Sequence, residues 1–304
     1  MYAPSGIEDQ VRKTVIKELS AFYPDYNVDN LGNLIVHKPG SKKTIAITAP
    51  MDELSFLVIN DSDESSVTID SLSAVKKNVL ENISLTDKND KVYICNNVKG
   101  SDEFCKLNSI KAECYDMCKV KKHYSKSLSE QLVYTTQCIS NSDYIIGKAL
   151  ERSVACSILC NLARNLVDSM FEYYFIFSSQ NYCDRKGACV ATNGLKIDEL
   201  YNLCGIDEDA NENVKCGDGI VIILRDKKYV SSENFAEKFS KYNNKQLFVT
   251  NDYVCEGGCY FRQKDTKNCI SVAFPIKHMH APNEIVKIED IKYLEKTILE
   301  IILP

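Results

Sequence analysis

Apolar residues recur at helical spacing in three parts of the chain. Near the start, one face of a predicted helix carries Val11, Val15, Leu19 and Phe22. Ser5 and Glu8 stand where a capping box would begin this helix, and Pro24 would end it. Two later stretches show the same period, with apolar positions at Leu150, Val154, Ile158, Leu162 and Leu166, and at Ile291, Leu294, Ile298 and Ile301.

Short apolar runs bounded by turn residues predict strands between these helices. The runs are rich in β-branched and aromatic residues and cover 33–37, 44–48, 54–59, 66–72, 172–179, 219–224, 246–250 and 269–275. The Pro39-Gly40 pair indicates a turn between the first two runs, and residues 233–242 have the pattern of a further helix. Because strands alternate with helices, the sequence predicts an α/β fold with a central sheet covered by helices on both faces.

Residues 68–144 have a different pattern from the rest of the chain. They contain short strand-like pieces, scattered Lys and Cys, and no long amphipathic helix. We therefore expect a discontinuous α/β domain, residues 1–67 and 145–304, with an inserted β-rich domain, residues 68–144. The basic stretch 118–126 does not show the aromatic interleaving that a single-strand nucleic-acid groove requires, so we interpret it as a solvated edge.

Composition narrows the classes of function. The 304-residue chain is 44% hydrophobic, which is enough to bury a full core. A net charge of −5 argues against a protein that mainly coats nucleic acid or an anionic membrane. The first residues lack a signal-peptide pattern and no window approaches the apolar length of a membrane span, so we expect a cytoplasmic protein.

The fourteen cysteines are spread along the chain, and without a signal peptide we expect them to be reduced and mostly buried. The tightest pairs are Cys114/Cys118 and Cys255/Cys259, and neither has a companion Cys-x-x-Cys or His cluster. This spacing disfavours a structural zinc site, because such sites usually combine two short pairs of ligands.

The stretch "AITAPMDELSFLV", residues 46–58, is typical of a buried strand, a tight turn with two carboxylates, and a second strand. Asp52 and Glu53 at a strand end suit a metal site or an acid/base site, although a solvated turn would have the same residues. Pro50, two residues before Asp52, has no side-chain lone pair to offer a metal.

Five separated segments together resemble the M42 family of metallo-aminopeptidases, which includes the self-compartmentalising tetrahedral aminopeptidases. The segments keep the family's order along the chain and are 3–12, 29–40, 49–58, 147–156 and 274–286. The resemblance implies an α/β peptidase domain with a β-barrel-like inserted dimerisation domain, assembled as a homo-oligomer, often a dodecamer. It also implies two divalent metals, zinc or cobalt, that share a bridging carboxylate and a water, with a Glu as general base. Paired metals lower the pKa of such a water and polarise the scissile carbonyl, and the base accepts the proton of the water.

The family's motifs can be carried over to this chain one residue at a time. Its metal-binding His falls on Pro50, while the Asp that orients that His is kept as Asp52. The bridging Asp falls on Glu151, which has the same charge on an arm longer by one methylene. The Asp of the family's Gly-Gly-Thr-Asp-Ala turn is absent from residues 257–261, which read GGCYF.

The family's paired glutamates, one the base and one a ligand, fall on Asn181 and Tyr182. The remaining Asp and His ligands fall on Asp207 and His280. One metal would then have Glu151 and Asp207, and the other Glu151 and His280, which is fewer than the three ligands plus water expected of catalytic zinc. The amide of Asn181 cannot act as a base at neutral pH.

These losses predict a catalytically inactive or severely impaired homologue that acts as an oligomeric scaffold or binds peptides or another partner. The alternative is an active aminopeptidase with an atypical or single-metal site that uses Glu53, Asp184 or a cysteine. A subunit that co-assembles with an active paralogue would have the same sequence features.

Overall fold

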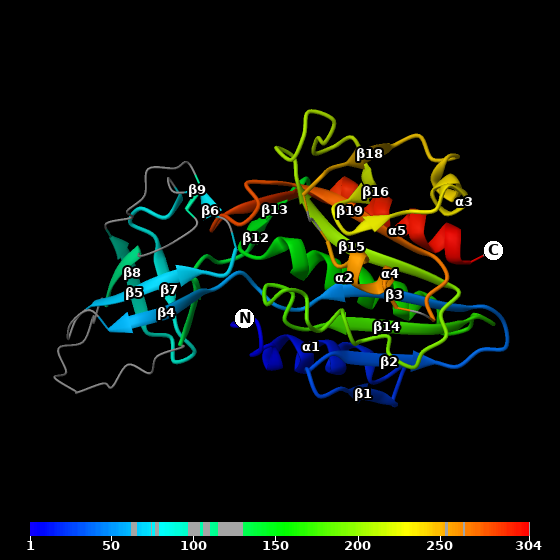
Figure 1. The fold of residues 1–304 in the computed structure, drawn as a ribbon, viewed down its shortest axis with the longest axis horizontal. Helices are drawn as coiled ribbons and strands as arrows, with labels where there is room; N and C mark the ends of the chain where they lie inside the picture. Colours follow the sequence, from blue (N-terminus) through cyan, green and yellow to red (C-terminus); the bar gives the residue numbers. More distant parts are fainter. Residues whose placement is uncertain are drawn as a thin grey trace.

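A computed structural model describes most of the chain. The described residues are 1–61, 66–73, 75–76, 79–96, 104–105, 110–114, 130–252, 255–263 and 265–303. The basic stretch 118–126 and Cys118 lie outside them. Figure 1 shows a large α/β body and, at one end of it, a smaller β-rich body.

The large body is built on a twelve-stranded mixed sheet. Nine strands follow one path, in the order β1 (Tyr26–Val28), β2 (Leu34–Lys38), β14 (Glu172–Ser178), β3 (Thr44–Pro50), β15 (Glu199–Asp207), β19 (Cys269–Lys277), β20 (Glu284–Lys287), β13 (Tyr144–Gly147) and β12 (Ile139–Ser140). Off this path, β16 (Ile220–Asp226) pairs with β19, and β17 (Tyr229–Val230) and β18 (Lys245–Val249) both pair with β16.

The four central strands β14, β3, β15 and β19 are parallel, so their carboxyl ends meet at one edge of the sheet. Pro50 lies opposite Ser178, and Asp207 lies opposite Ile276. Ligand sites of open α/β sheets lie outside this edge. The strand register therefore brings the turn after Pro50 close to the end of β15.

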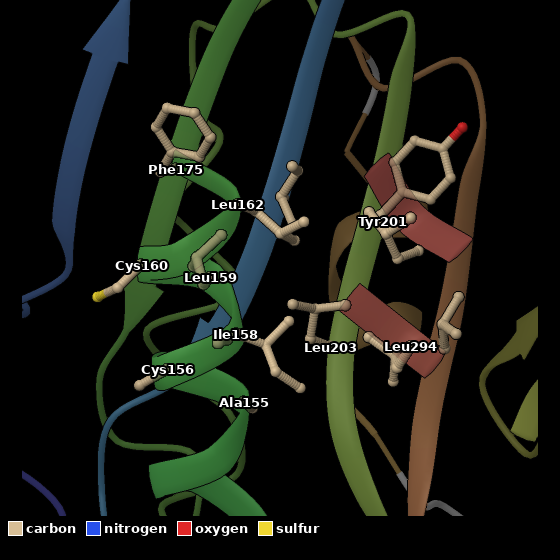
Figure 2. Packing of buried hydrophobic residues seen from close by; sticks show 14 of the residues in the cluster. Ala155, Cys156, Ile158, Leu159, Cys160, Leu162, Phe175, Tyr201, Leu203 and Leu294 are labelled. Atoms are coloured by element: carbon tan, nitrogen blue, oxygen red, sulfur yellow. The ribbon is translucent and has the colours of Figure 1, made fainter. Parts of the chain in front are cut away.

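One face of the sheet is covered by the three long helices. They are α1 (Asp9–Leu19), α2 (Leu150–Asn165) and α5 (Ile288–Ile302), and α2 packs between the other two. Figure 2 shows Ile158, Leu159 and Leu162 of α2 against Phe175 of β14 and Leu203 of β15. Such fully buried side chains contribute about 1.5–3 kcal/mol each by leaving water.

The other face of the sheet has its own apolar cluster, formed by the alternate side chains of the same strands, such as Ala46, Ile176 and Leu200. It is covered by the short helix α4 (Gly257–Phe261) and by the turn-rich segment 181–194. The expected α/β architecture is confirmed, with unequal helical cover on the two faces.

The smaller body is a closed barrel, as the inserted barrel-like domain of the prediction requires. Its strands, in order, are β10 (Ile110–Cys114), β5 (Ser66–Ser71), β4 (Phe56–Asp61), β11 (Gln131–Tyr134), β7 (Ser84–Thr86) and β8 (Val92–Asn96). A separate two-stranded sheet pairs β6 (Val75–Lys76) with β9 (Phe104–Cys105). Phe56, Val67 and Ile69 belong to the core of the barrel.

The ends of the barrel segment differ from the predicted boundaries at 68 and 144. Strand β4 begins at Phe56 and pairs with β5 and β11 inside the barrel, whereas β12 and β13 pair along the β20 side of the large sheet. Strand pairing therefore places the barrel between residues 56 and 134. The division of the chain into two separate domains, residues 1–67 with 145–304 and residues 68–144, stays a prediction.

The helices predicted over 150–166 and around Ile291–Ile301 are confirmed as α2 and α5, and the predicted capping box is wrong. Helix α1 begins at Asp9 without a side-chain cap, because the Ser5 hydroxyl instead donates to Asp52. Glu8 accepts the backbone N–H groups of Gly6 and Gln180.

The structure also differs from the prediction at Phe22, in residues 233–242, and in one additional strand. Phe22 lies beyond the end of α1 and is 44% exposed. Residues 233–242 form only α3 (Glu233–Ala236) and the 3₁₀ turn η2 (Glu237–Phe239). Strand β15 was not predicted at all. Among the described helices, none has the length and apolar character needed to cross a membrane.

Candidate functional site

Glu151, in the first turn of α2, is the centre of a buried polar cluster. The hydroxyl of Tyr182 donates to Glu151 Oε2 at 2.9 Å, and His280 Nε2 lies 3.6 Å from the same oxygen. The rings of Tyr182 and His280 meet edge to face, with centroids 5.7 Å apart. Burial would raise the pKa of Glu151, but the hydrogen bond and charge of His280 and the Tyr182 hydroxyl outweigh it and lower the pKa.

Gly205 of β15 allows Glu151 to lie this close to the sheet. A Cβ at residue 205 would be 3.1 Å from Glu151 Cα and 2.2 Å from Ile276 Cδ1. Any larger side chain would therefore move the start of α2 or the side chain of Ile276.

Glu284 fixes the backbone on both sides of this cluster. Its Oε2 accepts the N–H groups of Leu150 at 2.5 Å and Glu151 at 3.3 Å, and its Oε1 accepts the N–H of His280 at 2.8 Å. A carboxylate is favourable at a helix N-terminus because the free N–H groups point toward it. Burial, and next the charge of Glu151, raise the pKa of Glu284 to about 7.

Asp52 and Glu53 are fully buried, so the solvated-turn interpretation of these residues is wrong. Asp52 Oδ2 accepts the Ser5 hydroxyl and the N–H of Tyr182, the latter at 2.9 Å. Its Oδ1 has no hydrogen-bond partner among the described residues. Glu53 accepts the N–H of Ala3 at 2.8 Å and forms an ion pair with Lys148, also at 2.8 Å.

Pro50, two residues before Asp52, offers no partner for this Oδ1 oxygen, because a proline side chain neither accepts nor donates a hydrogen bond. Burial raises the pKa of Asp52, and the charge of Arg152 opposes this shift.

Arg152 is the buried cation of the site. It is 4% exposed, and its Nη1 donates to the carbonyl of Met51 at 3.2 Å. Its charge lowers the pKa values of both Asp52 and Glu151. The positive charge of Arg152 therefore offsets part of the negative charge of these two buried carboxylates.

The remaining predicted residues are spread around this cluster. Asn181 is buried in the segment that also carries Tyr182. Asp207, at the end of β15, uses Oδ1 to accept the N–H of Asp209 at 3.1 Å, and burial raises its pKa. Asp184 has an 81% exposed side chain that lies 3.8 Å from Lys228, so it faces solvent rather than the cluster.

A catalytic zinc site needs three protein ligands that converge on one point. Among the residues that the structure describes, no group of three or more His, Cys, Asp or Glu side chains is arranged to hold a metal ion. Glu151 Oε2 is engaged by Tyr182 and lies against His280, and the carboxyl of Asp207 is engaged in its own turn. The residues present therefore do not fit the two-metal site that the resemblance implies.

Glu256 is a second buried acid that the sequence did not indicate. Both of its carboxylate oxygens accept the Ser178 hydroxyl, at 2.8 and 2.7 Å, and Oε2 lies 3.3 Å from the hydroxyl of Tyr260. Burial is the main cause that raises its pKa to about 8. Because Ser178 pairs with Pro50, this acid lies next to the strand end that carries the site.

A large cavity lies beside the cluster rather than inside it. It has a volume of about 1260 Å³ and lies between α1, α2 and the barrel. Glu53, Lys148 and Arg152 line it, as do Ser153 and Ser157 on the exposed side of α2. Tyr182, His280 and Asp207 are not among its lining residues.

The mixed sheet with a parallel centre and an inserted barrel is similar in fold to solved structures. The TET1 peptidase of Pyrococcus horikoshii superimposes with a TM-score of 0.82 at 20% identity, over 98% of this chain and 94% of that chain. The aminopeptidase APDkam598 of Desulfurococcus kamchatkensis gives a TM-score of 0.84 at 16% identity, over 98% of this chain and 90% of that one.

Relatives in sequence identify the family to which this chain belongs. A "Putative aminopeptidase" of Acetivibrio thermocellus is 23% identical over 98% of this chain and 94% of its own length. Residues 127–296 match the model of the M42 glutamyl aminopeptidases. This match spans more than half of the sequence, and the chain belongs to the M42 family.

Proposed function

We propose that this chain is a non-hydrolytic M42 protein that has kept the fold as an oligomeric scaffold and a peptide-binding protein. The observation that carries the proposal is the Tyr182 hydroxyl on Glu151, at 2.9 Å. In the family this acid would bridge two metals, and here it is hydrogen-bonded by the residue that stands in place of a ligand.

Charge balance supports the same proposal. Arg152 supplies a positive charge next to Asp52 and Glu151, and His280 lies against Glu151. A divalent metal at Glu151 Oε2 would compete with the Tyr182 hydroxyl and would lie near the buried guanidinium, and repulsion between like charges opposes this. Glu151 and His280, which would bind the metal, are therefore held by contacts within the protein.

The base position leads to the same conclusion. Asn181 replaces the family's glutamate, and an amide cannot take a proton from water near neutral pH. Loss of a positioned general base typically costs a factor of about 10²–10⁴ in rate. Glu256 is a carboxyl near the end of β3 at Pro50, but it already accepts hydrogen bonds from the hydroxyls of Ser178 and Tyr260.

Self-association is part of the proposal. The PhTET1-12s structure contains a dodecamer, and TET1 of Pyrococcus horikoshii assembles into a tetrahedron or a large octahedral shell. We expect the barrel to contribute to the corresponding contacts in this protein. Light scattering at micromolar concentration should give a mass of several chains, and a monomeric mass would contradict the proposal.

We place peptide binding in the cavity between α1, α2 and the barrel. Its volume of about 1260 Å³ is sufficient for a short extended peptide, and Glu53 with Lys148 offers charged groups at its wall. Ser157→Trp would fill it from the exposed side of α2. This change should weaken binding of a fluorescent peptide pool at least about tenfold, or about 1.4 kcal/mol, whereas the same change at exposed Ser20, outside the cavity, should not.

Catalysis is tested with aminoacyl fluorogenic substrates in the presence of zinc, cobalt or manganese. The unmodified protein should show no hydrolysis above background. A variant with Pro50→His, Glu151→Asp, Asn181→Glu and Tyr182→Glu restores the family's residues at four positions and serves as the comparison. Chelator-sensitive hydrolysis that follows the unmodified protein through purification would refute the proposal.

An active aminopeptidase with a single or atypical metal is the second candidate. It is favoured by the proximity of His280 to Glu151, at 3.6 Å, and by relatives whose names include aminopeptidase. Under this alternative Glu151 and His280 would hold the metal, and Asp207 would become a third ligand once its side chain had rotated toward them. Substitution of His280 by Gln would then abolish hydrolysis and metal binding together.

A further inference from the structure

Two thiols from distant parts of the chain lie in contact on the face of the sheet that α4 covers. The sulfur atoms of Cys189 and Cys259 are 3.0 Å apart, although the residues are 70 positions apart in the sequence. Cys189 is exposed and Cys259 is buried. A disulfide bond is about 2.03–2.05 Å long, so the sulfurs need to approach by only about 1 Å to form one.

Backbone hydrogen bonds hold both partners in this arrangement. The N–H of Cys189 donates to the carbonyl of Arg185 at 3.1 Å, and its own carbonyl accepts the side-chain amide of Gln263. The N–H of Cys259, within α4, donates to the carbonyl of Glu256 at 2.8 Å. The contact therefore joins two anchored segments.

We propose that Cys189 and Cys259 are a peroxide-reactive pair that forms a reversible disulfide bond. The Cys189 thiolate attacks one oxygen of a hydroperoxide, so its sulfur becomes a sulfenic acid and the other oxygen leaves as water or an alcohol. The Cys259 thiol then attacks that sulfur, the S–S bond forms, and the sulfenic oxygen leaves as a second water. Two thiols are oxidised and one peroxide is reduced.

Exposure assigns the two roles. The peroxide can reach Cys189, which is exposed, whereas Cys259 lies behind it and is positioned to resolve the sulfenic acid. The neighbouring thiols Cys204 and Cys269 are buried, and burial keeps the pKa of Cys269 well above that of an ordinary thiol. The reactive thiolate form is less populated in such buried thiols than in an exposed cysteine.

The bond would fasten the segment that carries Tyr182 to α4. Cys189 follows Tyr182 in the turn-rich segment 181–194, and Glu256 at the start of α4 accepts the Ser178 hydroxyl. Oxidation should therefore protect both segments from local opening. This inference does not depend on the proposed function, since the pair lies outside the Glu151 cluster.

The experiment uses the full chain, reduced and then treated with hydrogen peroxide at equimolar concentration. Digestion without reductant and mass spectrometry should give the Cys189–Cys259 cross-linked peptide as the main disulfide, and dithiothreitol should remove it. In Cys259→Ser, Cys189 should instead accumulate as a sulfenic acid that dimedone traps. Cys138→Ser is the matched control, because Cys138 is also exposed, and it should leave the cross-link unchanged.

Two results would overturn the proposal. One is a Cys189–Cys259 cross-link no more abundant than cross-links that involve Cys138. The other is equal accumulation of dimedone-trapped Cys189 in the unmodified protein and in Cys259→Ser. If Cys259→Ser does not fold, Cys189→Ser replaces it at an exposed position, and Cys259 should then stay reduced at the same peroxide concentration.

Discussion

Removal of one hydroxyl at Tyr182 should destabilise the protein in the absence of any metal. In Tyr182→Phe, Glu151 loses the hydrogen bond of 2.9 Å while it stays buried at 5% exposure. Hydrogen bonds to charged groups contribute about 1.5–3 kcal/mol, so we expect a loss of about 2 kcal/mol in the free energy of unfolding. The reason is that a buried carboxylate would keep its charge with one partner fewer.

Tyr23→Phe is the matched control. The hydroxyl of Tyr23 is also buried and donates at 2.7 Å, but to the neutral carbonyl of Ala163, so its loss should cost about 1 kcal/mol. Urea unfolding at pH 7 with chelator present, followed by circular dichroism, measures both variants. A Tyr182→Phe protein as stable as the unmodified one, or less affected than Tyr23→Phe, would refute the role assigned to the hydroxyl.

Other substitutions test the buried acid Glu256, the approach of β15 to α2, and the core. The pKa of Glu256 is raised from 4.5 to about 8, so between these pH values the folded state binds more protons than the unfolded state. The free energy of unfolding should therefore fall as the pH rises from 4.5 to about 8. In pH-dependent thermal unfolding, Glu256→Gln should make this fall in stability shallower, because the contribution of Glu284, whose pKa is also raised, would remain, and the variant and the unmodified protein should have similar stability near pH 4. Gly205→Ala should cost about 1–3 kcal/mol in urea unfolding because its Cβ would meet Ile276, 2.2 Å away. Leu159→Ala, at 0% exposure in α2, should cost about 2–5 kcal/mol in the same assay, whereas exposed Ser157→Ala should change little.

The fold could be predicted where the apolar pattern repeats within one element. Helix α2 and strands β3, β14 and β19 have long runs of buried apolar residues, and their predicted ranges agree with the structure to within a few residues. Strand β15 was missed because it contains polar residues inside the protein. Its Asn202 donates to Thr48 at 3.0 Å and its Glu199 pairs with Lys43, so distant parts of the chain satisfy them.

The candidate site could be predicted only for residues that stand in recognisable motifs. Glu151 and His280 do lie together, and Asp52 does lie in the same buried region. Glu284 could have been suspected from its place four residues after His280, and Glu256 from its place directly before two glycines. The hydrogen bond from Tyr182 to Glu151 could not have been predicted, because it depends on how the 181–194 segment folds against the start of α2.

The central claim is that Glu151, the acid at the centre of the site, is held by the Tyr182 hydroxyl and His280 rather than by metal. The most direct measurement is the zinc and cobalt content per chain, by elemental mass spectrometry, after the protein is equilibrated with micromolar metal and passed through a desalting column. The account predicts a content well below one metal per chain, and a clear increase in the variant with Pro50→His, Glu151→Asp, Asn181→Glu and Tyr182→Glu. One or two metals retained per chain of the unmodified protein would contradict it.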